Sequence, residues 1–114
     1  MSIWQENLSE KICLVHVSGR LDQTSTPELE RELLRELDTG KCQLVVDLSE
    51  VVYVNSSGLR TLLTAWRKAN ERDARILLCC LSDRVLEVFS IVGFDKVFEI
   101  FDTADAAVAT LKED

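Results

Sequence analysis

The sequence predicts an α/β domain with a mixed β-sheet, in which an N-terminal hairpin precedes mainly parallel later strands and about four helices. Three observations predict it. Two short strand-like segments open the chain, apolar segments of strand length then alternate with segments of helical periodicity, and most helical segments carry a start or stop residue. Such alternation implies parallel strands joined by right-handed crossovers. With 114 residues and no repeat or linker, residues 1–114 are predicted to form one domain.

Ile3–Glu6 and Lys11–Val17 are predicted to be the two strands of the hairpin, with residues 19–24 as the following loop. Period-two alternation divides the second strand into two faces, one with Ile12, Leu14 and His16 and the other with Cys13, Val15 and Val17.

The first helix is predicted to start at Thr26 and to stop at Gly40. Thr26 is expected to cap it, Pro27 suits the first helical position, and Ser25 with Glu28 has the spacing of a capping box. The apolar stripe consists of Leu29, Leu33, Leu34 and Leu37.

The remaining elements alternate between buried strands and amphipathic helices. Their predicted bounds are strand 42–48, connection 49–55, helix 57–72, strand 75–81, helix 82–93, strand 97–101 and helix 102–111. The inward side chains of the helix over 57–72 are predicted to be Leu59, Leu62, Leu63, Trp66 and Ala69. Those of the helix over 82–93 are predicted to be Val85, Leu86, Val88, Phe89 and Val92.

Composition narrows the functional classes. The chain has 13 Lys and Arg against 20 Asp and Glu, a net charge of -7, which is unsuited to binding the phosphates of nucleic acid. No apolar segment approaches the about 20 residues of a membrane helix, and the acidic residues 1–10 do not resemble a signal peptide. We therefore expect a cytoplasmic protein without membrane insertion.

The four cysteines, Cys13, Cys42, Cys79 and Cys80, all lie in apolar segments. We expect them to be reduced, buried small side chains, with the adjacent Cys79 and Cys80 on opposite faces of a strand. The alternative is a vicinal redox pair. Because the chain has a single histidine and no cysteine pair at ligand spacing, the sequence predicts neither a metal site nor a cofactor.

The inventory of catalytic motifs argues against an enzyme. Neither glycine-rich nucleotide fingerprint is present, and Asn55–Gly58 lacks the leading glycine of a nucleophile elbow. His16, the only candidate base, is interpreted as a partly buried sheet residue. A hydrolase or transferase using Ser56 or Ser57 as nucleophile therefore has no support beyond the serines themselves, and nothing in the residues requires nucleotide binding near Asp22 and Ser56.

The segment 51–59 places an amide and two hydroxyls at the start of a helix. Helix capping by Asn55 or Ser56 explains this pattern structurally. The functional alternative is an anion site or a phosphorylated serine, since a helix N-terminus favours negative charge. Gly58 would allow another group to approach the backbone there.

These residues resemble the signature of STAS domains, specifically bacterial anti-sigma factor antagonists. The resemblance lies in Val45–Leu48, Val51 and Val54–Leu59, in the Gly-x-Leu-Asp loop of Ser18–Asp22, and in Ser82–Phe94, and so covers nearly the whole chain. In this family the first serine of the motif, here Ser56, is phosphorylated by an anti-sigma factor that is a serine kinase of the GHKL type. The unphosphorylated antagonist binds that kinase and frees the sigma factor, and a PP2C-type phosphatase reverses the modification.

The resemblance also implies a kinase-facing surface consisting of Asp22, Asn55, Ser57, Gly58 and Leu59. One departure is Asn55, where the family often has aspartate, so kinase recognition can differ. Ser57 is an alternative acceptor on chemistry alone. The alternative function is a STAS accessory module of a lipid transporter or signalling scaffold without a sigma-factor client. A weak homodimer through the hairpin, with Ile3 and Trp4 near the edge, is a further hypothesis.

Overall fold

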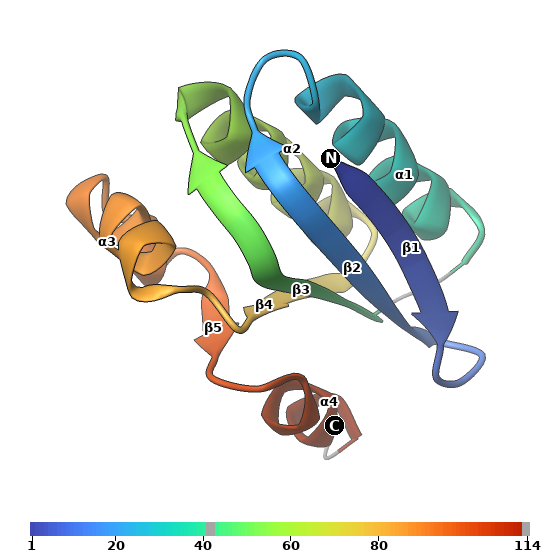
Figure 1. The fold of residues 1–114 in the computed structure, drawn as a ribbon. Helices are drawn as coiled ribbons and strands as arrows, with labels where there is room; N and C mark the ends of the chain where they lie inside the picture. The colour runs from blue at the N-terminus through green and yellow to red at the C-terminus, as the bar shows by residue number, and fades with distance from the viewer. Residues whose placement is uncertain (41–42, 113–114) are drawn as a thin grey trace.

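The computed structural model describes residues 1–40 and 43–112 as a five-stranded sheet with helices on both faces (Figure 1). The strands lie in sequence order, β1 antiparallel to β2 and all later neighbours parallel. The elements are β1 Ser2–Asn7, β2 Ile12–Leu21, α1 Thr26–Asp38, β3 Gln43–Val54, α2 Ser56–Glu71, β4 Arg75–Cys79, α3 Asp83–Ile91, the 3-10 turn η1 Phe94–Lys96, β5 Glu99–Phe101 and α4 Ala104–Lys112. The predicted fold class is confirmed.

The sheet separates two cores. Right-handed crossovers between successive strands carry α1, α2 and α3 to one face. That face forms the larger core, which includes Cys13, Val15, Val17, Leu29, Leu33, Leu62, Val85 and Phe89. Among the described helices, α4 covers the other face, where the core consists of Ile12, Leu14, Val45, Leu77, Cys79, Ala107 and Leu111. Figure 1 shows α1 and α2 behind the sheet and α4 near the end where β2 begins. The two predicted faces of β2 are confirmed.

Two strands extend beyond the predicted bounds. β2 runs to Leu21 and β3 to Val54, because Ser18–Leu21 pairs with residues 50–54 across two register shifts. Pairing with a neighbouring strand thus overrides the polar local sequence, and the predicted loop over residues 19–24 is wrong for its first three residues. The predicted first residue of β3, Cys42, lies outside the described residues.

The start of α1 differs from the prediction. Ser25, not Thr26, is the N-cap, and Pro27 is accordingly the second helical residue. The predicted capping box is absent, because the Ser25 hydroxyl is engaged with the preceding loop: it accepts from the Asp22 N–H at 3.1 Å and donates to the Arg20 carbonyl at 2.6 Å. The stripe is confirmed, with Leu29, Leu33 and Leu37 buried and Leu34 half-buried.

The second half of the chain needs three corrections. β4 ends at Cys79 rather than Leu81. β5 begins at Glu99 rather than Val97, because the N–H groups of Val97 and Phe98 donate to the Phe94 carbonyl in the turn after η1. In α3, Val85 and Phe89 are buried, but Leu86 is 37% and Val92 51% exposed rather than inward. The helix ends at Ile91, so Val92 lies beyond it. Leu86 lies beside the inward stripe formed by Val85, Val88 and Phe89.

Gly58 sets the distance between α2 and the end of β2. A Cβ atom on Gly58 would stand 2.8 Å from the Leu21 carbonyl oxygen and 3.1 Å from Cγ1 of Val54. That carbonyl also accepts a hydrogen bond from the Asn55 N–H at 3.1 Å, so it cannot easily withdraw. A side chain at residue 58 would therefore push α2 away from the sheet.

Replacing Gly58 by alanine is expected to lower the free energy of unfolding by about 1–3 kcal/mol through overpacking, although alanine is the better helix former. Urea unfolding measures this, and Arg67→Ala, on the exposed face of the same helix, should stay within about 0.5 kcal/mol of the original protein. Equal stability of Gly58→Ala and the original protein would show that the Leu21 backbone yields.

Candidate functional site

Two connections meet at the edge of the sheet where β2 and β3 end. The Asn55 N–H donates to the Leu21 carbonyl, and the Asn55 side-chain amide donates to Oε1 of Gln23 at 3.2 Å. These bonds hold the loop after β2 against the start of α2. Ligands of open α/β sheets commonly bind at this edge, because the loops after parallel strands converge there.

Asn55 caps α2, as predicted. Its backbone is extended, and its Oδ1 accepts from the N–H groups of Ser57 at 2.9 Å and Gly58 at 3.3 Å. Ser56 is therefore the first helical residue. Its side chain is exposed, and among the described residues its hydroxyl has no hydrogen-bond partner. Ser57, the alternative acceptor, is half-buried.

Asp22 lies half-buried in the adjoining loop as a fixed carboxylate. Hydrogen bonds from the Thr24 hydroxyl at 2.7 Å and the Thr24 N–H at 3.0 Å hold the pKa of Asp22 below its usual value. Nε of Arg20 stands 3.7 Å from its second oxygen, and the Arg20 guanidinium carbon lies 4.1 Å from the ring centroid of Tyr53. Asp22 is therefore ionised at neutral pH.

A shallow hollow of about 290 Å³ opens beside Ser56. It is lined by Ser56, Leu59, Arg60, Leu63, Val92 and Phe94. Val92, which follows α3, is 51% exposed, and its neighbour Ile91, the last residue of α3, is 76% exposed. The edge around Ser56 is therefore both polar and apolar, as in surfaces that bind proteins. The sequence does not reveal the hollow, because the helical pattern predicts Val92 to lie in the core. The adjacent apolar residues Ile91 and Val92 at the end of a short helix are the signal that could identify it.

The structure brings the residues implied by the resemblance to one edge, in different states of exposure. Ser56 is exposed, and Asp22, Asn55 and Ser57 are half-buried. Leu59 is 7% exposed but lines the hollow, whereas Gly58 is buried against Leu21. Gly58 therefore contributes to this edge indirectly, by fixing the position of α2 against the end of β2.

His16 stands apart from this edge. Its Nε2 lies 2.6 Å from Oε1 of Glu6, its Nδ1 lies 3.1 Å from Oδ2 of Asp47, and the Trp4 ring stacks on it at 5.0 Å. It is a partly buried sheet residue, as predicted. Neither carboxylate that it contacts belongs to the Ser56 edge, so the structure gives Ser56 no histidine base.

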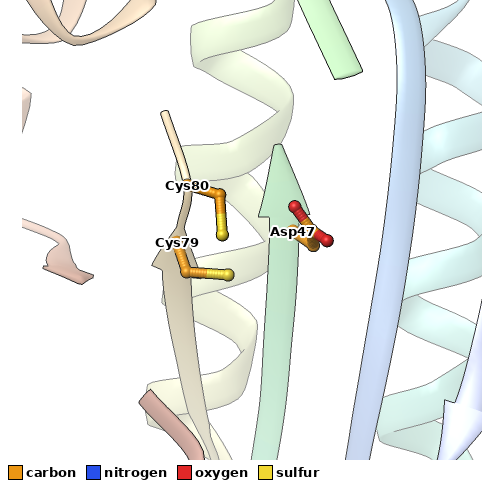
Figure 2. Close-up of side chains that lie close together, drawn as sticks. All are labelled: Asp47, Cys79 and Cys80. Atoms are coloured by element: carbon orange, nitrogen blue, oxygen red, sulfur yellow. The ribbon is translucent and has the colours of Figure 1, made fainter. Parts of the chain in front are cut away.

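The cysteines are only partly as predicted. Cys13 and Cys79 are buried and Cys80 is half-buried; Cys42 lies outside the described residues. Burial raises the pKa of the Cys79 thiol, which is therefore protonated at neutral pH. The expectation that Cys79 and Cys80 face opposite sides is wrong. β4 ends at Cys79, Cys80 has a left-handed backbone with φ of 67°, and both thiols lie near the carboxylate of Asp47 (Figure 2).

The described residues include no helix with the length and apolar character to span a bilayer.

Comparison with known proteins shows the family to which this chain belongs. The STAS domain family matches residues 5–107. A Bordetella bronchiseptica protein named as an anti-sigma factor antagonist is 32% identical over 96 residues, 84% of this chain and 83% of the relative. The anti-sigma-B factor antagonist of Listeria monocytogenes is 31% identical over 87 residues, 75% of each chain. The crystal structure of an anti-sigma factor antagonist from Mycobacterium paratuberculosis has a TM-score of 0.88 at 24% identity, covering 97% of this chain and 93% of that one. The chain belongs to the STAS domain family, and its relatives named here are anti-sigma factor antagonists.

Proposed function

We propose that this protein is an anti-sigma factor antagonist: it binds a serine-kinase anti-sigma factor of the GHKL type, thereby frees a sigma factor, and is switched off by phosphorylation of Ser56. The observation that carries the proposal is the exposed Ser56 hydroxyl without a partner among the described residues, at the capped start of α2 and on the rim of an apolar hollow. A PP2C-type phosphatase would return the protein to its binding state.

The position of Ser56 favours modification without unfolding. Asn55, not Ser56, supplies the cap, so a phosphate on Ser56 leaves the bonds to the Ser57 and Gly58 N–H groups in place. The helix dipole favours negative charge at this end. Arg60 lies one turn further along the same face and lines the same hollow, so its guanidinium is in position to neutralise part of the added charge.

The same phosphate would oppose partner binding. It adds a charge of roughly -1.5 to -2 beside an apolar hollow that a partner would have to cover. Burying that charge against Leu59, Leu63 and Val92 would leave it without water, and any acidic group of the partner would be repelled. A penalty of about 1.4 kcal/mol already lowers affinity tenfold.

We assign the partner-facing surface to Asp22, Asn55, Ser57 and Leu59 around Ser56. Asp22 offers a fixed carboxylate with a pKa lowered by Thr24, suited to a basic group of the kinase. Asn55 offers an uncharged side chain already bonded to Gln23 and to the helix start. Relative to an aspartate in the same place, it leaves one less negative charge beside the acceptor hydroxyl.

The acceptor is tested in the protein purified from its own host. We expect one phosphate, located on Ser56 by phosphopeptide mapping, to be lost in Ser56→Ala and retained in Ser57→Ala, because Ser56 is exposed whereas Ser57 is half-buried. Intact-mass measurement checks this. Loss in Ser57→Ala alone would move the acceptor, and absence of phosphate in stressed and unstressed cells alike would favour the accessory-module function.

The binding surface is tested by placing a charge at the hollow. Val92→Asp should weaken binding of the unphosphorylated protein to its anti-sigma kinase at least about tenfold, because the exposed Val92 side chain adjoins Ser56 across the hollow. Ala106→Asp, exposed on α4 across the sheet, adds the same charge and should bind normally. Calorimetric titration measures both affinities. Unchanged affinity of Val92→Asp would place the contact away from the hollow.

A further inference from the structure

A row of side chains crosses the sheet on the face that α4 partly covers. The register pairs Trp4 with His16, His16 with Asp47, and Asp47 with Cys79. One step closer to the start of the strands, Leu14, Val45 and Leu77 point the same way into the core beneath α4. The row is therefore a polar continuation of an apolar core, on the face opposite α1 and α2.

Cys80 adds a second thiol to this row. An alternating strand would direct it to the other face, but Cys80 has φ of 67°, a conformation that non-glycine residues rarely adopt. Its N–H donates to the Phe101 carbonyl at 3.0 Å, which holds the turned backbone against β5. The two sulfur atoms and a carboxylate oxygen of Asp47 consequently lie within 4.8 Å of one another, between β3 and β4 (Figure 2).

The Asp47 carboxylate is held in place from both sides. Its Oδ1 accepts from the Ser49 N–H at 2.9 Å, and its Oδ2 faces Nδ1 of His16 at 3.1 Å. Nε2 of His16 is in turn 2.6 Å from Glu6. Metal-binding carboxylates are commonly oriented by such outer hydrogen bonds. Each Asp47 oxygen keeps lone-pair capacity for a further contact.

We propose that Asp47, Cys79 and Cys80 form a binding site for a thiophilic divalent cation, with Zn²⁺ as the ion. Two sulfur donors and one oxygen select zinc over Mg²⁺ or Ca²⁺, which take oxygen ligands. In tetrahedral zinc, ligand atoms at about 2.0–2.3 Å from the ion stand about 3.5–3.8 Å apart, so these donors need only a small contraction. Each thiol would release its proton to solvent when its sulfur binds the ion.

The partial exposure of the site would let the ion enter and would leave room for a water molecule as its fourth ligand. Cys79 is fully buried, but Cys80 and Asp47 are half-buried, so an ion can enter from the open side and keep one water. The bound ion would join β3 to the end of β4 and to the segment that leads into α3. The site shares no residue with the Ser56 edge, so it does not depend on the phosphorylation proposal.

The test uses the full chain, stripped with a chelator and kept in a thiol-free reductant. Cd²⁺ titration is followed by thiolate-to-metal charge-transfer absorption, and Zn²⁺ affinity is measured against a chromophoric chelator. We expect one ion per chain. His16→Ala, which leaves all three donors, should weaken binding roughly 10–100-fold, and Cys80→Ala should weaken it more, because it removes a ligand.

The matched control is the double variant Cys13→Ala/Cys42→Ala, which removes the other two thiols and should bind as the original protein does. Cys79→Ala also removes a ligand and should weaken binding as Cys80→Ala does. Circular dichroism verifies that each variant is folded, and Cys80→Ala alone tests the site if Cys79→Ala does not fold. Unchanged affinity in folded Cys80→Ala, or equal loss in the double variant, would overturn the proposal. The proposal would also be overturned if the isolated protein contained a Cys79–Cys80 disulfide and bound no zinc after that disulfide was reduced.

Discussion

The carbonyl group of Leu21 is the point on which the Ser56 edge depends. It accepts the Asn55 N–H at 3.1 Å, and the missing side chain of Gly58 lets the first turn of α2 pack directly on it. Through these two contacts the end of β2 fixes where α2 begins. Asp22 follows Leu21 in the chain and Ser56 follows Asn55, so one backbone group determines the spacing of a carboxylate and a hydroxyl from separate connections. A surface that recognises a partner needs such rigidity, because loose groups lose entropy on binding.

In the proposed function, the separate roles of Asn55 and Ser56 would suit this edge to a reversible charge. The Asn55 side chain accepts hydrogen bonds from the N–H groups of Ser57 and Gly58. The Ser56 hydroxyl therefore does not cap the helix, and it has no hydrogen-bond partner among the described residues. A serine serving as the cap itself would have to exchange that bond for a phosphate ester. Here the added group would meet a helix start that favours negative charge and an arginine one turn away, so the modification would act on binding more than on folding.

Local patterns predicted the elements and both faces of β2, because period-two and 3.6-residue repeats reflect burial directly. They were wrong where tertiary pairing decides. Ser49 and Glu50 are polar, yet they belong to β3 because β2 continues beside them. Ser25 has capping spacing, yet its hydroxyl bonds to Arg20 and Asp22. The position of Ser56 could be predicted from its motif, whereas the hollow beside it could not, because Val92 and Phe94 reach it from a different part of the chain.

The cysteines illustrate the limit of local rules most sharply. Alternation assigns Cys79 and Cys80 to opposite faces, and it fails because β4 ends between them and the backbone of Cys80 turns left-handed. Of the two thiols, Cys79 is buried in the core beneath α4, whereas Cys80 is only partly buried against it. Against Asp47 the same turn assembles donors that soft cations prefer. The fold thus presents different chemistry in two places: oxygen and sulfur donors on the sheet face beside α4, and a hydroxyl with an apolar hollow at the start of α2.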